Sequence, residues 1–445
     1  MLLSTGIGAC SNQEVKSVEL QKQLTTTNYD MIIIAPSVFK KNLQPLIDHK
    51  NNVGIQTTLL TTEDIYAQYE GRDAAEQIKY AIKDAKEQWN ISFVLLVGGM
   101  KLFGLGWYVP VRYSNLNDGS GYSVFLTDLY FADIYKENTT EFDNWDSNGN
   151  GIFAEWGKDT LDLTPDVAIG RLPCRTTTEV DIMVDKIITY ETEANGSSWS
   201  NRMVAIGGDT LPAYEGYEGE ATCDIATSYM TGCTIQKLYT STGNLTGPAD
   251  IINAVNQGCG FVMTRGKGGT DRIRMGLPEG SELIAFRNKD ISRLTNKNQY
   301  PIIVLGECIH GKFDVNIRNL VKVLLNKSGY TRYDCIYECI AWRLVREKDA
   351  GAIATLTNTN ICYGAPGDAD ENGIPDDAEM YGGFLAVELF RLYGQEGIHT
   401  LGILHQQALT NYVNQFPVNT NKYHSKSVQE FILLGDPSLQ IGGYS

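Results

Sequence analysis

The chain has 445 residues, of which 42% are hydrophobic, with 24 Tyr and 14 Phe. That is enough for a sizeable core, and the length fits two or three domains or one large α/β unit split into two halves. The formal net charge is −16 and no long run of Lys or Arg occurs, which argues against nucleic-acid binding. The sequence has no apolar run of about 18 residues, so we expect no membrane-spanning helix.

The N-terminal stretch MLLSTGIGACSNQ resembles the end of a lipoprotein leader, in which small and apolar residues precede a lipidated cysteine. On this interpretation Cys10 anchors the protein to a lipid surface, although the basic start of such a leader is missing. The alternative is an unstructured N-terminus. Residues 11–29 are polar and without periodicity, so 1–29 is interpreted as a leader remnant and linker.

From residue 30 short apolar runs alternate with amphipathic segments. The all-apolar run 31–34 is typical of a strand in a sheet that is covered on both faces, and 54–60 and 93–97 are predicted as further strands. Residues 37–50 are predicted to be helical, and Asp73 is a good N-cap for a second helix. This β-α-β-α-β order implies a parallel sheet with right-handed crossovers.

Regularity fades over 100–165, which is rich in Gly, Asn, Asp and aromatic residues. A strand at 167–172 and a helix follow. The polar break at 194–201 then divides the chain into an N-terminal unit, 30–198, and a C-terminal unit, 199–445, which repeats the alternation. Its predicted strands are 203–206, 235–239, 261–263, 302–305 and 352–356. Its predicted helices are 219–230, 248–257, 333–346 and 377–415, the last broken into two near 394–397, and residues 431–441 close the chain.

Two of these strands end in glycine-flanked tips. The first tip is Arg265-Gly266-Lys267-Gly268-Gly269, and the second is the segment 306–311, which holds Cys308. Ligands of open α/β sheets bind at the carboxyl ends of strands, so we expect Lys267 and Cys308 to lie side by side at one edge. A thiol there is a candidate nucleophile, and the alternative is a buried structural cysteine.

Several ordered blocks resemble the gingipain family of cysteine peptidases, which belongs with the caspase-like peptidases. They are ADIINAVNQGCGFVMTRGKGG, DISRLTNKNQYPIIVLGECIHGKFD, PDVAIGRLPCRTTTEVDIMVDKIITYE, ECIAWRLVREKDAGAIATLTNT and FILLGDPSLQI, and the similarity runs from about residue 30 to 442. The resemblance implies a caspase-like α/β/α sandwich with mostly parallel sheets in two subdomains. It also implies hydrolysis of peptide bonds, with catalysis in the second subdomain.

The resemblance places the family's nucleophile on Cys308 and its oxyanion donors on the backbone N–H groups of Gly268 and Cys308. The family's general base is a histidine in a Gly-His-Gly tip, and that position is Lys267 here. Asp166 is a weak candidate for the acidic residue that orients the base. His310, two residues after Cys308, is a candidate to replace the missing imidazole.

The exchange of histidine for lysine changes the expected chemistry. Histidine titrates near 6.5 and lysine near 10.4, so a neutral lysine at pH 7 needs a drop of roughly 3 units, or about 4 kcal/mol. A charged Lys267 would still stabilise a thiolate on Cys308, but it is a poor acid for the leaving amine. The sequence therefore predicts a cysteine endopeptidase with an altered dyad, or alternatively an inactive peptidase-like surface or binding protein.

Residues 368–379, DADENGIPDDAE, match the full pattern of a calcium-binding loop. Alternate oxygens at positions 1, 3, 5, 7, 9 and 12 converge on one hard cation, and the glycine at position 6 permits the sharp turn. The predicted ligands are Asp368, Asp370, Asn372, the carbonyl of Ile374, Asp376 and Glu379. The alternative is a solvated acidic turn.

A second, looser calcium loop begins at Asp146. Its predicted ligands are Asp146, Asn148, Asn150, Ile152 and Glu155, with the glutamate at position 10 rather than 12. Weak sites of this kind suit extracellular calcium concentrations. We therefore expect a calcium-stabilised protein outside the cell or at its surface, which acts on a polypeptide substrate or binds a protein ligand.

Overall fold

The computed structural model describes residues 28–445 apart from 102–103, 212, 215 and 326–334. The leader interpretation and the lipid anchor at Cys10 lie outside the described residues. None of the described helices is both long enough and apolar enough to cross a bilayer.

The four large-sheet strands of the first half are parallel to one another, as the β-α-β-α-β pattern predicts. They are β1 (Met31–Ala35), β2 (Thr57–Thr61), β3 (Phe93–Val97) and β6 (Ala168–Leu172). Every residue of β1 and β6 is buried, and β1 accordingly is a continuous apolar run. The accompanying helices are η1 (Ser37–Phe39), α2 (Lys40–Asn52), α3 (Thr62–Gln68), α4 (Ala74–Trp89), α5 (Leu129–Ala132) and α6 (Thr177–Glu193). The predicted N-cap Asp73 accepts from the Glu76 N–H.

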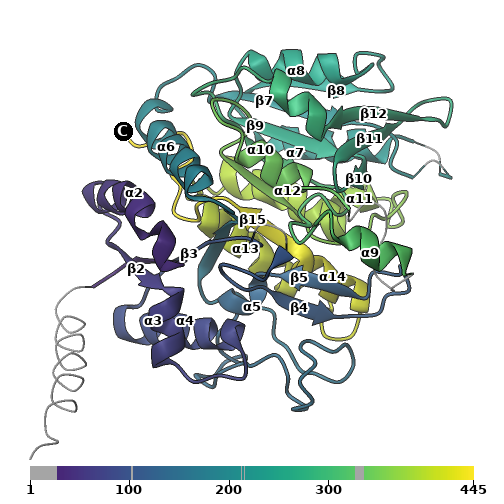
Figure 1. Cartoon of the computed structure of the whole chain (residues 1–445). Helices are drawn as coiled ribbons and strands as arrows, with labels where there is room; N and C mark the ends of the chain where they lie inside the picture. Colours follow the sequence, from purple (N-terminus) through teal and green to yellow (C-terminus); the bar gives the residue numbers. More distant parts are fainter. Residues whose placement is uncertain (1–27, 102–103, 212, 215, 326–334) are drawn as a thin grey trace, which may run out of the picture.

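The strands of the second half extend the same sheet. They are β7 (Arg202–Gly207), β8 (Thr234–Tyr239), β9 (Phe261–Arg265), β13 (Ile302–Leu305), β14 (Ala354–Asn358) and β15 (Phe431–Leu434). The ten strands run in the order β2-β1-β3-β6-β15-β14-β13-β9-β7-β8. The C-terminal strand β15 joins the halves because it pairs parallel with β6 and antiparallel with β14 (Figure 1). The predicted boundary at 198/199 therefore falls between strands of one continuous sheet, and the division into two units stays a prediction.

Helices cover both faces of this sheet, as a sandwich requires. The crossover helix between β7 and β8 is α7 (Glu218–Tyr229), and the one between β8 and β9 is α8 (Pro248–Asn256). These two crossovers move in opposite directions across the sheet, so right-handedness places α7 and α8 on opposite faces. The remaining helices are η3 (Asn288–Arg293), α9 (Asn319–Leu324), α10 (Ile340–Val345), α11 (Asp376–Glu379), α12 (Tyr381–Gly394), α13 (Leu401–Gln415) and α14 (Lys422–Glu430).

Some expected elements differ from the structure. Of the helix predicted over 333–346, the described residues form only α10, which begins after its N-cap Cys339. The chain also forms two small antiparallel sheets that alternation did not predict. One contains β4 (Arg112–Asn115) and β5 (Val124–Thr127), and the other contains β10 (Lys267–Gly269), β11 (Arg272–Gly276) and β12 (Glu282–Arg287).

Candidate active site

The two glycine-flanked tips lie together, as the sequence predicts. Strands β9 and β13 are parallel neighbours, with Thr264 paired to Leu305, so both end at the same edge of the large sheet. The two tips also touch directly. A Cβ atom added to Gly268 would lie 1.9 Å from the carbonyl oxygen of Cys308 and 2.7 Å from its nitrogen. Only glycine permits this close approach of the two backbones.

The turn after Cys308 has an unusual backbone. Ile309 has a φ of +55°, a left-handed conformation that costs a β-branched residue roughly 1–2 kcal/mol. Hydrogen bonds to the segment after β14 hold this turn in place: the Ile309 N–H donates to the Asn360 carbonyl over 2.8 Å, and the Gly311 N–H to the Asn358 carbonyl over 2.9 Å. Strain that the surroundings maintain in this way is characteristic of functional turns.

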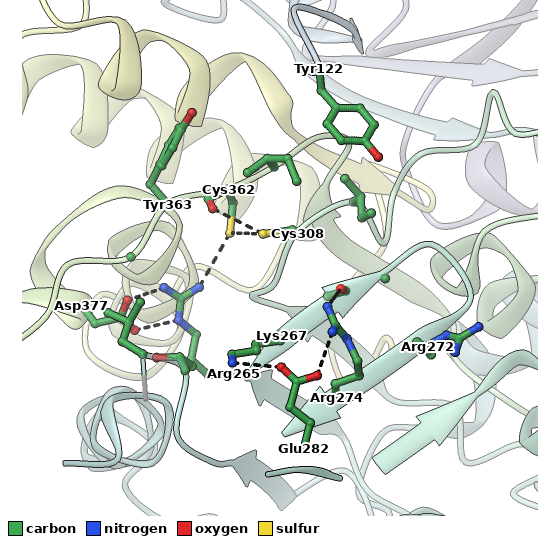
Figure 2. A pocket seen from close by; sticks show the side chains of 18 residues that line it. Tyr122, Arg265, Lys267, Arg272, Arg274, Glu282, Cys308, Cys362, Tyr363 and Asp377 are labelled. Atoms are coloured by element: carbon green, nitrogen blue, oxygen red, sulfur yellow. Dashed lines mark hydrogen bonds and ion pairs between the residues drawn. The ribbon is translucent and has the colours of Figure 1, made fainter. Parts of the chain in front are cut away.

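A cavity of about 500 Å³ opens at this edge and contains both tips (Figure 2). Cys308, Lys267 and Gly268 all line it. It also receives residues from β11, from β12 and from the segment that follows β14. Its other lining residues are Tyr122, Thr210, Leu211, Arg265, Gly266, Gly269, Arg272, Arg274, Glu282, Ile309, Ile361, Cys362, Tyr363, Gly364 and Asp377.

The thiol of Cys308 faces a second cysteine that sequence reasoning had not connected to it. Its Sγ lies 3.9 Å from Cys362 Sγ and donates to the Cys362 carbonyl over 3.4 Å. The hydrogen bond between the two sulfurs lowers the pKa of Cys308, against the opposing effect of burial. The same hydrogen bond, together with burial, raises the pKa of Cys362 well above its ordinary value. Of the two thiols, Cys308 is therefore the one that ionises more readily.

Lys267 is held away from the thiol by an ion pair. It begins strand β10 instead of standing on an isolated turn, and it lies opposite Arg274 of β11. Its Nζ lies 3.0 Å from one carboxylate oxygen of Glu282, and Arg274 contacts the other at 2.8 Å (Figure 2). Partial burial raises the pKa of Glu282, but the hydrogen bond from Lys267 and the charge of Arg274 outweigh it and lower that pKa. Within the described residues, Lys267 makes no hydrogen bond to Cys308.

Beneath the thiols lies a buried ion pair that sequence reasoning missed. The Arg265 side chain is 3% exposed and its guanidinium binds the fully buried carboxylate of Asp377, with Nε 2.7 Å from Oδ2. The other side of the guanidinium donates to the Gly306 carbonyl, at the base of the Cys308 turn. Thr222 donates to the same carboxylate over 2.8 Å. In the sequence, the one sign of this ion pair is Asp377, an acid that follows the predicted calcium ligand Asp376 without being a predicted ligand itself.

None of the five histidines lines the cavity. His310 is fully buried, with Nε2 3.0 Å from the Arg272 carbonyl and Nδ1 3.4 Å from Glu307. It therefore points away from Cys308 and does not replace the missing imidazole. Asp166 does not line the cavity either, because its carboxylate accepts the N–H groups of Ile134 and Tyr135 in the first half of the chain.

The first calcium loop brings carboxylates together. Asp370, Asp376 and Glu379 each present an oxygen within 4.8 Å of the others, a separation that one cation can bridge. Asp368 accepts the N–H groups of Asn372 and Gly373. The loop ends beside the cavity, because Asp377, the residue after Asp376, binds Arg265.

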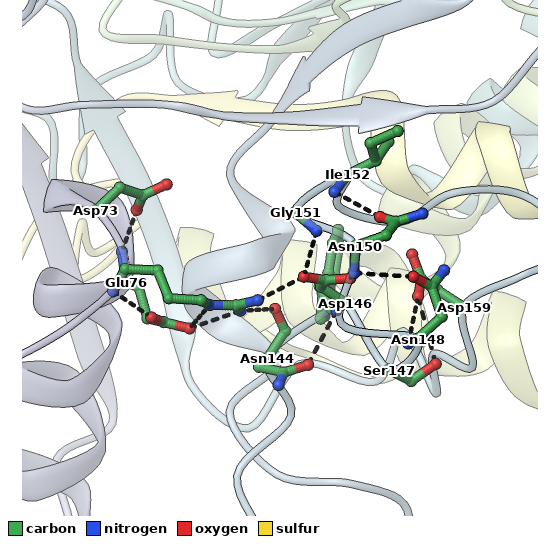
Figure 3. A network of polar contacts seen from close by, with 12 residues as sticks. Asp73, Glu76, Asn144, Asp146, Ser147, Asn148, Asn150, Gly151, Ile152 and Asp159 are labelled. Atoms are coloured by element: carbon green, nitrogen blue, oxygen red, sulfur yellow. Dashed lines mark hydrogen bonds and ion pairs between the residues drawn. The ribbon is translucent and has the colours of Figure 1, made fainter.

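The second loop has the same internal hydrogen bonds (Figure 3). Asp146 accepts the N–H groups of Asn150 and Gly151, and the Asn150 side chain accepts that of Ile152. Among the described residues, its carboxylates do not form a convergent group as those of the first loop do, and Arg72 binds Asp146. The Asn150 amide donates to Glu155, as the Asn372 amide donates to Glu379 in the first loop. Sequence reasoning also missed Asp159, whose carboxylate accepts from the Asn148 and Glu155 backbones.

Comparisons with known proteins agree with this geometry. The model of peptidase family C25 matches residues 24–442. Gingipain R2 of Porphyromonas gingivalis strain W83 is 22% identical over 301 residues, which is 67% of this chain and 34% of that protein. Gingipain R1 of the same species is 22% identical over 64% of this chain and 24% of its own length. The matches thus span about a third of the first relative and about a quarter of the second.

Solved structures extend the likeness of fold to nearly the whole chain. The crystal structure of the Arg-specific cysteine proteinase gingipain R has a TM-score of 0.65 at 19% identity and covers 93% of this chain and 78% of its own. The complex of the pro- and mature domains of RgpB of Porphyromonas gingivalis gives 0.64 at 18% identity, with 92% and 79% covered. The predicted caspase-like fold is thereby confirmed. The chain belongs to peptidase family C25, the gingipain family of cysteine peptidases.

Proposed function

We propose that the chain is a gingipain-like cysteine endopeptidase in which Cys308 attacks the carbonyl of a bound polypeptide. The observation that carries this proposal is the position of a thiol with a lowered pKa on a strained turn inside the cavity. The thiolate is the reactive form of cysteine, and a strand end next to a glycine tip lets a substrate backbone approach.

Two backbone groups are suited to stabilise the developing oxyanion. The N–H of Cys308 donates no hydrogen bond within the described part of the chain, so it is available to a substrate oxygen. Gly268 packs against the Cys308 backbone, and the family resemblance assigns the second donor to its N–H. Preorganised donors of this kind are usually the largest single contribution to acyl transfer.

Proton transfer to the leaving amine is the weak step of this site. Lys267 is held in an ion pair with Glu282, and a lysine ammonium is a poor acid near neutral pH. An ester with a good leaving group needs no such proton. We therefore expect Cys308 to be acylated readily by activated peptide esters and only slowly by the matching amides.

The test compares both substrate types on one pool of peptides of mixed sequence. The wild type, Cys308→Ala and Lys267→His are each assayed with activated esters and with amides, and acylation of Cys308 is followed by mass spectrometry. Acylation of the wild type that disappears in Cys308→Ala supports the proposal. If an electrophilic peptide probe leaves Cys308 unmodified with and without calcium, the enzyme proposal is wrong.

A second candidate function is polypeptide binding without hydrolysis. The observation that favours it is the Lys267–Glu282–Arg274 cluster, which occupies the general-base position with groups already bound to one another. If this candidate is right, peptides from the same pool should bind equally well to the wild type and to Cys308→Ala, and neither protein should release cleaved product. Product release by the wild type alone contradicts this candidate.

We also propose that the loop 368–379 binds calcium and stabilises the fold. The three convergent carboxylates support it, because Asp370, Asp376 and Glu379 repel one another without a cation. Chelation should lower the melting temperature of the wild type, and Glu379→Gln should reduce that effect. An unchanged melting temperature after chelation contradicts the proposal. The loop at Asp146 is a weaker candidate, since Arg72 already neutralises its first acid.

Two further expectations remain proposals. An extracellular or cell-surface location is supported by these loops, whose pattern suits millimolar calcium. A lipid anchor at Cys10 rests on the leader-like sequence alone. Incorporation of a labelled fatty acid into the full chain, and its loss in Cys10→Ala, is the direct test.

A further inference from the structure

We infer that Cys308 and Cys362 form a reversible disulfide that protects the nucleophile and switches the site off. The two sulfurs are 3.9 Å apart, and both cysteines line the cavity. A disulfide requires a separation near ~2.05 Å, so the sulfurs need to approach by about 2 Å from their present positions. All cysteines that the structure describes are free thiols.

The surroundings of Cys362 distinguish it from a structural cysteine. Cys174, Cys223, Cys259 and Cys339 are buried, where thiols act as small apolar side chains. Cys362 is partly exposed to the cavity, and its sulfur lies near polar groups, 3.7 Å from the Gly306 carbonyl and 4.0 Å from the Arg265 guanidinium. A cysteine in this position contributes little packing, but it reaches the nucleophile directly.

Hydrogen bonds between the two segments hold the sulfurs at this distance. The Asn358 side chain donates to the Glu307 carbonyl over 3.2 Å, just before Cys308. The Ile309 N–H, just after Cys308, donates to the Asn360 carbonyl over 2.8 Å. Because both segments are already fixed in the reduced protein, closing the disulfide requires little further ordering of the chain.

The chemistry balances with a hydroperoxide as the oxidant. The Cys308 thiolate attacks the peroxide, the O–O bond breaks, and Cys308 becomes a sulfenic acid while hydroxide or an alkoxide leaves. The Cys362 sulfur then attacks the sulfenic sulfur. The S–S bond forms, the S–O bond breaks, and the oxygen leaves as water with the proton of Cys362. A dithiol reverses the reaction by thiol–disulfide exchange and is itself oxidised.

The hydrogen bond between the two sulfurs explains why Cys308 is oxidised before Cys362 reacts. The hydrogen bond to Cys308 is the first cause of the raised pKa of Cys362, so Cys308 is the thiol that reacts first with the oxidant. Once Cys308 carries oxygen, that hydrogen bond to a thiolate is gone, and Cys362 ionises more easily. Cys362 is thereby suited to resolve the sulfenic acid before irreversible oxidation to the sulfinic acid occurs.

The experiment treats the full chain with graded hydrogen peroxide and maps disulfides by digestion under non-reducing conditions. The expected result is a peptide pair that links Cys308 to Cys362 with the loss of two hydrogens, reversed by dithiothreitol. In Cys362→Ser, the same treatment should drive Cys308 to sulfinic acid, which dithiothreitol does not reverse. Cys233→Ser, which changes another partly exposed thiol outside the cavity, is the matched control and should behave as the wild type does.

Absence of the linked peptide pair, with equal sulfinic acid at Cys308 in the wild type and in Cys362→Ser, overturns the inference. Disulfide mapping on the wild type gives this answer even if the serine variant folds poorly. The protective role rests on the proposed function, but the mapping does not require turnover. A disulfide that forms in a protein without acyl chemistry supports the inference and contradicts the peptidase proposal separately.

Discussion

The two glycine-flanked tips end neighbouring strands of one sheet, yet they serve the proposed chemistry differently. The Cys308 tip forms a strained turn that exposes a thiol with a lowered pKa to the cavity. The Lys267 tip continues into strand β10, and its side chain is bound to Glu282. The contact between Gly268 and Cys308 remains intact. The backbone framework of a site can thus be kept while a single side chain decides how far the reaction proceeds.

The largest effect is expected at the thiol itself. Cys308→Ala should abolish labelling by electrophilic peptides and reduce ester turnover by roughly 10³-fold or more, because the other thiol that lines the cavity, Cys362, has a raised pKa. Labelling is measured by mass spectrometry of the intact protein. The melting temperature should change little, since the side chain is partly exposed. Residual labelling at Cys362 would show that the wrong thiol has been assigned as nucleophile.

A change at the other tip should act in the opposite direction. Lys267→His supplies a group that titrates near neutral pH, so amide cleavage should rise by about 10²-fold or more, within the usual range for general acid–base catalysis. Ester turnover should change much less, because its leaving group needs no proton. The amide-to-ester ratio, measured side by side, checks this. Lys267→Gln is the matched control, which removes the charge without supplying a base, and it should leave amide cleavage low.

The contact between the tips is tested by Gly268→Ala. The new methyl group would lie 1.9 Å from the Cys308 carbonyl oxygen, so the backbones must separate. We expect a loss of about 1–3 kcal/mol in the free energy of unfolding. Ester turnover should fall by about 10²-fold, because the oxyanion donors are displaced. Gly247→Ala is the control, since no atom lies within 4 Å of its added methyl group. Equal behaviour of the two variants would contradict the contact.

The smallest expected effect is a shift in the pH at which Cys308 becomes half-reactive toward an alkylating agent. The hydrogen bond from Cys362 lowers the pKa of Cys308, so the reactive thiolate is present at lower pH than in an ordinary cysteine. Alkylation by iodoacetamide should therefore have its midpoint below the usual range, and the rate should fall as pH drops through that midpoint. Cys362→Ala removes the first cause of the lowering, so the midpoint should move upward. Cys233, whose pKa is raised by burial, serves as an internal reference.

The sequence determined the features that depend on short-range patterns. Continuous apolar runs predicted buried parallel strands. The glycine-flanked ends of β9 and β13 predicted that Lys267 and Cys308 lie at the same edge of the sheet. The two calcium-loop patterns predicted matching turns, because their hydrogen bonds join residues only two to five positions apart. Strand β10 was not predicted, because it forms only by pairing with β11.

Only the tertiary structure decided how the site works. Cys362 is 54 residues from Cys308, and Asp377 is 112 residues from Arg265, so no local pattern brings either pair together. The partner of Lys267 and the inward direction of His310 likewise depend on neighbours that packing supplies. Residue type states which chemistry a side chain can perform. Distance, burial and charge, which arise from contacts between distant segments, decide which of those chemistries this fold permits.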